Sequence, residues 1–270
     1  MPELPEVEMV ARGLREPLVG QMITEVRCHW PRHLDGLSVS ELQKRVYGRA
    51  IQAINRRGKY LLFALDDGQT LIIHLRMSGR LSVVAADSPA DKHTHTIFAL
   101  NNGQELRFWD QRKFGRVYLV DDAQKVVGKL GPEPLGADFS VAVLRERLNG
   151  RKRTLKPFLL DQTFVAGLGN IYADEALFYA GILPTRTSDT LCEVEIARLY
   201  EAIQKALRMG IERGGASLEL YLRPDGTAGS MQTALAEFRR TGESCYDCGT
   251  LIERIVLGGR STHFCPHCQV

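Results

Sequence analysis

The chain has 270 residues, enough for one large domain or for two to three small ones. Its 44% hydrophobic content supports a buried core, yet no apolar run approaches the length of about 18 residues that a membrane span needs. The N-terminus carries no apolar signal core, which argues against secretion. A net charge of +3 is too small to indicate nucleic-acid binding by itself.

The first residues place an amine beside an acid. Removal of Met1 would leave Pro2 as a secondary amine, and an N-terminal amine titrates near about 7.7–8, so part of it is uncharged at neutral pH. We expect a helix to begin at Pro5, and its positive end should lower the pKa of this amine. Glu3 supplies a carboxyl group next to it. These are the components of imine chemistry, although an ordinary helix start with acids near the dipole is the alternative.

The chain up to residue 130 is predicted to be mainly β-structure. Strands are expected over residues 21–30, 60–65, 70–75, 94–100, 105–109 and 115–120, with a helix over residues 38–46 that has Ser40 as its N-cap. The runs Asp66-Asp67-Gly68 and Asn101-Asn102-Gly103 predict hairpin turns. Strands and turns at this spacing predict an antiparallel β-sandwich or a flattened barrel.

Helical periodicity dominates after the segment Leu130-Gly131-Pro132-Glu133-Pro134-Leu135-Gly136, which we take as a domain boundary. Helices are expected over residues 141–148, 155–162, 171–180 and 192–210. The predicted fold is therefore α+β with three domains. They are an N-terminal helix and β-sandwich (residues 1–130), a helical domain (residues 131–236) and a small C-terminal finger (residues 237–270).

The C-terminal finger carries the strongest local motif. Two Cys-x2-Cys pairs with sixteen residues between them are formed by Cys245, Cys248, Cys265 and Cys268. This spacing is typical of a four-cysteine zinc site, and four thiolates leave no open coordination position, so the zinc would be structural. His263 and His267 are alternative ligands that a complete set of cysteines makes unnecessary.

Two features of the C-terminal half suit phosphate binding. Gly167-Leu168-Gly169-Asn170 leads into a predicted helix, whose N-terminus offers N–H groups to an anion, and Lys156 ends a basic run that starts at Arg151. Arg260 lies at the tip between the cysteine pairs, where it could contact nucleic acid. An ordinary helix connection and a solvated hairpin tip are the alternatives.

The β-region holds further candidates for binding nucleic acid. They are Lys59, His74, Met77, Arg112 and Phe114. An apolar side chain beside arginines is what a protein needs to unstack a duplex and hold it open. Taken singly, Met77, Phe114 and His74 could equally be structural residues.

These motifs together resemble the bacterial formamidopyrimidine-DNA glycosylases, which repair 8-oxoguanine, over the whole chain. The matching pieces are residues 2–8, Gly58-Lys59-Tyr60-Leu61, His74-Leu75-Arg76-Met77-Ser78-Gly79, Arg112-Lys113-Phe114-Gly115, residues 130–135, Gly167-Leu168-Gly169-Asn170-Ile171-Tyr172 and the four-cysteine finger. The resemblance implies a helix-two-turn-helix in the helical domain and a zinc-finger β-ribbon at the C-terminus.

The resemblance also implies roles for individual residues. Pro2 would attack C1′ of the damaged nucleotide, Glu3 would act as general acid and base, and the strand would be cut by β,δ-elimination. Lys59 and Arg260 would complete the catalytic set at the phosphates around the lesion. The DNA-binding residues would be His74, Met77, Arg112, Phe114, Lys156 and Asn170. We expect one structural zinc ion, no redox cofactor, damaged double-stranded DNA as the partner, no membrane, a monomer, and a cytoplasmic, nucleoid-associated location in a bacterium.

The sequence departs from the family pattern at three places. Met231 precedes Gln232 where an aromatic residue is usual, Gln111 replaces a usual proline, and the usual Val-Tyr-Gly-Arg run reads Glu237-Phe238-Arg239-Arg240. The first and the last lie near the loop that would cover the damaged base, so they bear on lesion preference. Two alternatives stay open: a sister class that acts on oxidised pyrimidines, and a catalytically silent DNA-damage binder or zinc-ribbon adaptor.

Overall fold

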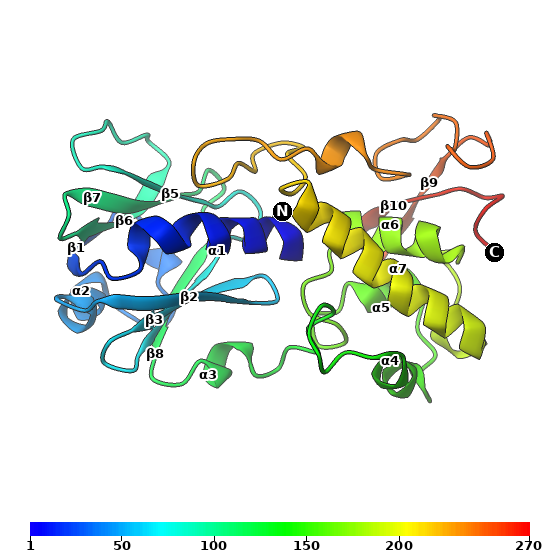
Figure 1. Cartoon of the computed structure of the whole chain (residues 1–270), viewed down its shortest axis with the longest axis horizontal. Coiled ribbons are helices and arrows are strands. Elements are labelled where there is room, and N and C mark those ends of the chain that lie inside the picture. The colour runs from blue at the N-terminus through cyan, green and yellow to red at the C-terminus, as the bar shows by residue number, and fades with distance from the viewer. The chain divides into compact units, whose positions relative to one another are not determined.

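The computed structural model describes residues 1–270, which form two compact units (Figure 1). Unit 1 contains Met1–Lys129 and Arg213–Ser230, and unit 2 contains Leu130–Glu212 and Met231–Val270. The segment 213–230 thus belongs with the N-terminal half, although it follows the helices of unit 2 in the chain. The division into three domains stays a prediction. None of the helices has the length and apolar character needed to cross a membrane.

Unit 1 is an antiparallel β-sandwich with a helix packed in it, as predicted. One sheet has the strand order β1 (Ile23–Cys28), β6 (Thr94–Leu100), β7 (Gln104–Trp109) and β5 (Arg80–Ala85). The other has the order β2 (Ile51–Arg57), β3 (Tyr60–Leu65), β4 (Thr70–His74) and β8 (Arg116–Val120). Helix α1 (Leu4–Leu18) contacts β2 and β3 of one sheet and β5 of the other, so it is covered on two sides.

Helix α1 forms because apolar residues recur along one face of it. Val7, Val10, Ala11, Leu14 and Leu18 are fully buried and join the core between the sheets. The helix begins at Leu4, one residue before the predicted start, because Glu3 and Glu6 form a capping box around its first turn.

The predicted N-cap of the second helix was wrong by two residues. Helix α2 (Val39–Val46) is capped by Ser38, whose Oγ accepts a hydrogen bond of 3.1 Å from the Glu41 N–H. Ser38 has the extended backbone of an N-cap and stands three residues before a glutamate, which is the usual capping arrangement. Ser40 lies in the first turn and contacts Ser38 instead. The 3-10 turn η1 (Pro31–His33) and the short helix α3 (Gln124–Val127) complete this unit.

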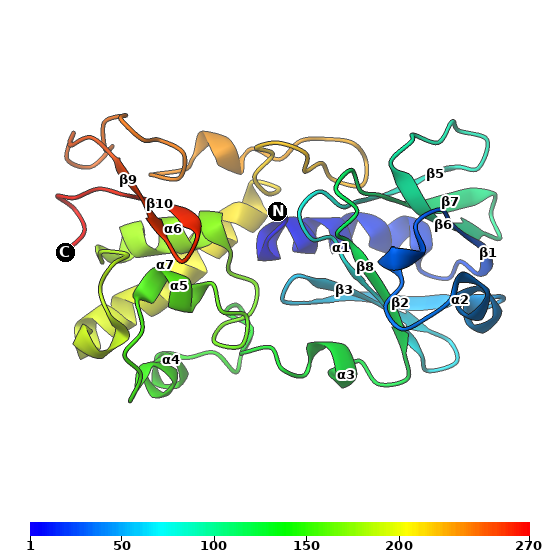
Figure 2. The same ribbon diagram turned by 180° about the vertical axis from the view of Figure 1, so that it is seen from behind.

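Unit 2 is built from helices and one hairpin. Helices α4 (Val141–Leu148), α5 (Leu155–Leu159), α6 (Asn170–Ala180) and α7 (Glu193–Glu212) include a tightly packed α6–α7 pair. Helix α6 stops where predicted because Gly181 adopts the left-handed conformation, with φ of 66°. The hairpin of β9 (Glu253–Leu257) and β10 (Arg260–Phe264) places β10 against α6, as Figure 2 shows from behind. Short 3-10 turns lie at Ser188–Thr190 and Met231–Thr233.

Gly115, which follows Phe114, tests the packing of unit 1. A Cβ atom at Gly115 would overlap the ring of Phe108. We expect Gly115→Ala to lower the free energy of unfolding by about 1–3 kcal/mol, the usual cost of overpacking a core. Urea unfolding measures this cost. It should shrink when Phe108→Leu has removed the ring, and an equal cost in both backgrounds would refute the overlap.

Candidate active site and nucleic-acid interface

Pro2 and Glu3 lie together at the N-terminus of α1, and both are buried. The Glu6 carboxylate fixes this end of the chain because it accepts one hydrogen bond from the Glu3 N–H and another from the Ala216 N–H, each of 2.8 Å. A carboxylate at a helix N-terminus is also favoured by the helix dipole. The sequence pattern identified Pro2 and Glu3, but nothing in it pointed to Ala216, which lies 210 residues away from Glu6.

Lys59 lies in the turn between β2 and β3 and is only 5% exposed. The neighbouring Arg56 ties this turn to α1. Its Nε donates to Glu8 Oε2 at 3.0 Å, and its Nη1 donates to the Gly58 carbonyl at 3.1 Å. Burial by itself would raise the pKa of Glu8, but the hydrogen bonds from Arg12 and Arg56 outweigh burial and lower it. The ionised Glu8 therefore holds the lysine turn beside the helix that carries Pro2.

His74 is a neutral hydrogen-bond donor. Burial lowers its pKa to about 3, and the nearby charges of Arg76 and Lys59 add to this effect. Its Nδ1 accepts a hydrogen bond of 2.9 Å from the Arg76 N–H, so the ring proton is on Nε2. A neutral imidazole with Nε2–H can donate to a phosphate oxygen at any physiological pH.

The loop that carries Arg112 and Phe114 is organised by Asp110, which is fully buried. Its carboxylate accepts hydrogen bonds from the Ser78 hydroxyl and from the Gly115 N–H, the latter at 2.7 Å. Burial would raise the pKa of Asp110, but the His33 ring, whose Nε2 lies 3.5 Å from Oδ2, and the hydrogen bonds from Ser78 and Gly115 lower it. Ser78 Oγ in turn accepts from the Arg112 N–H at 3.0 Å. One carboxylate thus joins the loop of Met77 and Ser78 to the loop of Arg112 and Phe114, which we call the wedge loops because Met77 and Phe114 are expected to enter the duplex.

The wedge side chains themselves point outward. Phe114 is 49% exposed, and the guanidinium carbon of Arg112 lies 4.9 Å from the centre of its ring. Met77 is half-buried on the neighbouring loop. Phe114 is thus not a core residue, and its insertion into a duplex stays a prediction.

In unit 2 the glycine turn is held by a glutamine that the sequence analysis did not single out. Gln162 Oε1 accepts from the Gly167 N–H at 2.9 Å, and its Nε2 donates to the Leu168 carbonyl at 2.8 Å. The turn places Asn170 at the first position of α6. Asn170 Nδ2 donates to Ser261 Oγ at 3.3 Å, so the amide lies next to the residue that follows Arg260 in the finger.

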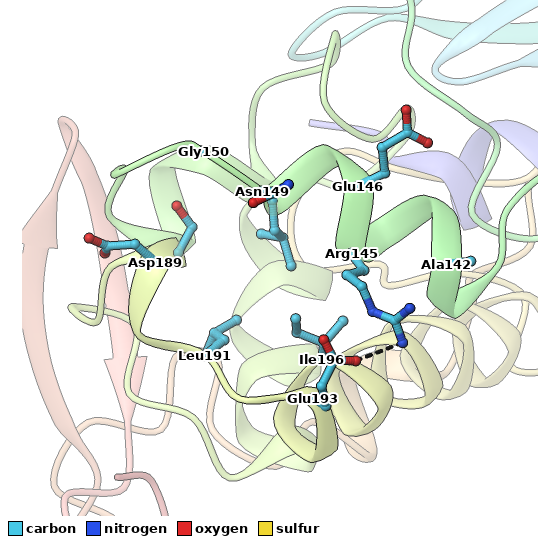
Figure 3. Close-up of a pocket in the computed structure, with 11 residues that line it drawn as sticks. Ala142, Arg145, Glu146, Asn149, Gly150, Asp189, Leu191, Glu193 and Ile196 are labelled. Carbon is cyan, nitrogen blue, oxygen red and sulfur yellow. Dashed lines mark ion pairs between the residues drawn. The ribbon is translucent and has the colours of Figure 1, made fainter.

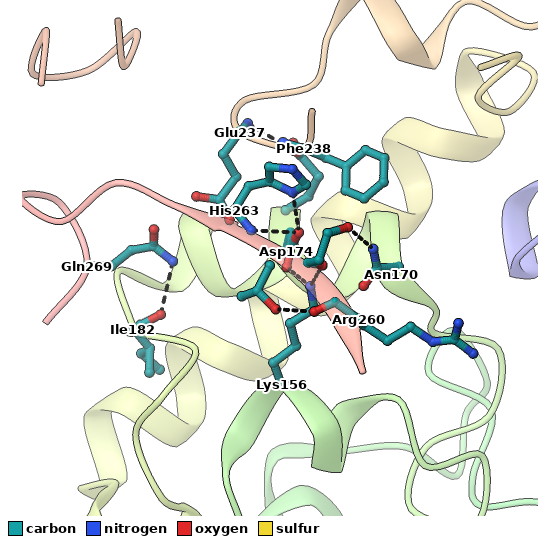
Figure 4. Close-up of polar contacts among 12 residues, drawn as sticks. Lys156, Asn170, Asp174, Ile182, Glu237, Phe238, Arg260, His263 and Gln269 are labelled. Carbon is teal, nitrogen blue, oxygen red and sulfur yellow. Dashed lines mark hydrogen bonds and ion pairs between the residues drawn. The ribbon is translucent and has the colours of Figure 1, made fainter. Parts of the chain in front are cut away.

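Lys156 does not reach the surface as a DNA contact would require. It is fully buried, and its Nζ lies 2.5 Å from Asp174 Oδ1 and donates to the Ser261 carbonyl at 2.6 Å (Figure 4). The other oxygen of Asp174 accepts from the backbone and the ring of His263, both at 3.1 Å. The expectation of a direct phosphate contact thus gives way to a positioning role. Lys156 and Asp174 fix strand β10, and with it Arg260, against helix α6.

The four cysteines of the finger come together as predicted. Their Sγ atoms all lie within 4.8 Å of one another. A tetrahedral zinc with Zn–S bonds of about 2.3 Å would need sulfur atoms about 3.8 Å apart, so this cluster fits the ion. His263 is committed to Asp174 and lies outside the ligand set. The finger therefore holds one structural zinc ion through four cysteines.

A surface pocket of unit 2 lies elsewhere. It is formed by α4, the 3-10 turn at Ser188–Thr190 and the start of α7, and an ion pair of 2.6 Å between Arg145 and Glu193 borders it (Figure 3). None of the predicted site residues lines this pocket.

Comparison with known proteins gives the same assignment along the whole chain. Residues 1–117 match the formamidopyrimidine-DNA glycosylase N-terminal domain, residues 130–221 the H2TH domain of that glycosylase, and residues 242–270 the zinc finger found in FPG and IleRS. The chain belongs to the formamidopyrimidine-DNA glycosylase family. The Herpetosiphon aurantiacus formamidopyrimidine-DNA glycosylase is 51% identical, with complete coverage of both chains, and that of Geobacillus kaustophilus is 46% identical with the same coverage.

Solved structures of formamidopyrimidine-DNA glycosylases have the same fold. A Lactococcus lactis Fpg mutant in complex with DNA that contains Fapy-dG superposes with a TM-score of 0.94 at 41% identity, covering 99% of both chains. A complex of Lactococcus lactis Fpg with DNA that contains an abasic site gives a TM-score of 0.93 at 41% identity and the same coverage.

The neutral state of His74 predicts a pH dependence of stability. Unfolded histidine takes up a proton near pH 6.5, whereas folded His74 does so near about 3, so the unfolded state binds more protons between these values. Stability contributed by this group is therefore lost as the pH falls through this window, by about 2 kcal/mol between pH 7 and pH 5. Urea unfolding of the native protein and of His74→Asn at both pH values should show a smaller loss in the variant. Equal losses would contradict the assignment.

Replacing a cysteine of the zinc cluster should have effects that replacing a cysteine outside the cluster does not have. Cys268→Ala should lower the bound zinc, measured by atomic absorption, and should weaken binding to an abasic-analogue duplex, because the ribbon that carries Arg260 loses its support. Cys192→Ala is the matched control, since Cys192 is an exposed cysteine outside the cluster. Full zinc content and DNA affinity in Cys268→Ala would exclude the structural role.

Proposed function

We propose that Pro2 is the nucleophile of this enzyme, which is a base-excision-repair DNA glycosylase and AP lyase for oxidised purines such as 8-oxoguanine and formamidopyrimidines. The observation that carries the proposal is the arrangement at the start of α1. Pro2 and Glu3 lie side by side in the chain at a helix N-terminus that the Glu6 carboxylate fixes through two backbone hydrogen bonds. Imine chemistry requires an amine and a nearby acid, both held in a fixed position.

The chemistry follows from these groups. The Pro2 nitrogen attacks C1′, the bond from C1′ to the damaged base breaks, and the base leaves with the bonding electrons and a proton. Opening of the sugar ring, with a proton delivered by Glu3 to the ring oxygen, leaves an iminium between Pro2 and C1′. The iminium acidifies C2′, so loss of a proton there expels the 3′ phosphate and a second elimination expels the 5′ phosphate. Hydrolysis of the iminium then restores the amine.

The remaining site residues bind and hold the DNA. Lys59 and the neutral His74 contact phosphates around the lesion, and Asn170 and Arg260 contact phosphates from the helix turn and the finger. Met77, Arg112 and Phe114 fill the gap left by the extruded base, since an enzyme that acts on a base must take it out of the stack. Lys156 acts by positioning the strand that carries Arg260. We infer that the enzyme acts on the chromosome of a bacterial cell, in the cytoplasm at the nucleoid, because its relatives are bacterial and its proposed contacts are with duplex DNA.

Particular residues favour this proposal over the two alternatives. Leu4 and the run Gly58-Lys59-Tyr60-Leu61 favour the purine branch over the sister class for oxidised pyrimidines. The presence of Pro2, Glu3 and Lys59 argues against a catalytically silent binder. Cleavage assays on duplexes with 8-oxoguanine, formamidopyrimidine or an oxidised pyrimidine should show preference for the first two.

Borohydride should trap a covalent adduct between the protein and an 8-oxoguanine duplex, and mass spectrometry should locate it at Pro2. An uncleaved N-terminal extension turns the Pro2 amine into an amide without changing any side chain. The extended protein should therefore give no adduct and no strand cutting while still binding an abasic-analogue duplex. An adduct on the extended protein, or on another residue, would exclude Pro2 as the nucleophile.

A further inference from the structure

Three residues other than glycine have a backbone in the left-handed region, and all three are basic. They are Arg76, Lys113 and Arg239, with φ of 55°, 59° and 65°. Arg76 and Lys113 belong to the loops that carry Met77 and Phe114, the proposed wedge of unit 1. Side chains are disfavoured in this conformation, and residues held in it against their preference concentrate at functional sites. Arg239 is the one whose loop the proposed site does not yet use.

The strain at Arg239 is imposed by a loop with little freedom. The N–H groups of Ala236, Glu237 and Phe238 donate to the buried Glu175 carboxylate at 2.8, 3.1 and 3.1 Å. The Arg240 guanidinium then closes the other side of the loop with a hydrogen bond to the Ala236 carbonyl and one of 2.8 Å to the Ser244 carbonyl. Residue 239 must accept the left-handed conformation that these bonds define, and glycine would accept it without strain.

The loop is also placed beside the phosphate-binding residues of unit 2. The Phe238 ring packs edge-on against His263, with ring centres 5.1 Å apart, and His263 lies on strand β10 together with Arg260. Figure 4 shows the Phe238 ring, the Asn170 amide and the Arg260 guanidinium on one side of the Lys156–Asp174 pair. Arg239 is exposed, and its guanidinium carbon lies 6.0 Å from the centre of the Phe238 ring.

Arg239 is exposed in this loop, whereas its acidic neighbour Glu237 is not. Glu237 is fully buried, and burial together with the charges of Asp174 and Glu175 raises the pKa of its carboxyl well above the usual range. The exposed side of this turn therefore presents a guanidinium, which suits a phosphate oxygen pair better than any other side chain does.

We propose that Arg239 binds a backbone phosphate of the substrate duplex, as an additional contact at a position whose left-handed backbone favours glycine. This inference rests on the proposed function of the chain as a DNA glycosylase. It accounts for why a strained cation stands where the backbone favours glycine, since the contact with DNA offsets the loss of stability.

The Arg239→Gly variant tests whether Arg239 binds phosphate or has only a structural role or none. The variant removes both the strain and the cation, so its urea midpoint should rise while its affinity for a duplex with an uncleavable abasic analogue falls severalfold at about 0.1 M salt. The slope of log Kd against log salt should become shallower by about one. Arg239→Asn, which tolerates the left-handed conformation, should lose affinity in the same way, and Arg239→Lys should keep the slope.

Lys125→Gln is the control for loss of an exposed positive charge away from the site, and it should leave the affinity for the duplex and the slope unchanged. A higher urea midpoint in Arg239→Gly with unchanged affinity and slope would overturn the phosphate contact. An unchanged or lower midpoint would overturn the strain on which it rests. Borohydride trapping by the native protein is scored separately: its absence refutes the proposed function, whereas its presence with unaltered binding in Arg239→Gly refutes this inference alone.

Discussion

Buried carboxylates that accept backbone N–H groups are the interaction on which the functional loops of this protein depend. Glu6 fixes the N-terminus through the Glu3 and Ala216 N–H groups. Asp110 binds the Gly115 N–H of the wedge loop, and Glu175 binds three consecutive N–H groups of the loop at Arg239. Taking a carboxylate out of water is unfavourable unless it is bonded, and charged acceptors make short, strong hydrogen bonds, so each loop is held in one geometry.

The same principle explains why Lys156 is a positioning residue. A basic run suggested a solvated cation, yet the folded chain removes Lys156 from water and pairs it with Asp174. Breaking such a buried pair leaves an uncompensated charge, so its two members depend on each other strongly. Asn170 and Arg260, the two proposed phosphate contacts of unit 2, lie on one side of this pair, one on a helix and one on a strand, and their relation to each other is set within unit 2.

Much of the fold could be predicted because it follows from local patterns. Periodicity located most strands and helices, turn signals located the hairpins, and cysteine spacing located the zinc cluster. Where the prediction failed, the deciding contacts are either a choice between neighbouring residues, as for Ser38 and Ser40, or contacts between distant segments. Neither the burial of Lys156 nor the left-handed backbone at Arg239 has a local signature. The roles of Pro2 and Glu3 could be inferred only because the resemblance supplied a substrate.

The bond between Glu6 and Ala216 has a consequence for how the protein is made. The ribosome synthesises the catalytic end first, but Glu6 lacks one of its two donors until residue 216 has emerged. At a synthesis rate of about 5–20 residues per second, this delay lasts on the order of ten seconds or more. During that time the first helix can dock, but Glu6 has only the Glu3 N–H as a donor and the segment 213–230 has not yet joined unit 1. Removal of Met1, which would create the proposed amine, is not tied to this interval, since Met1 stays 44% exposed in the folded chain.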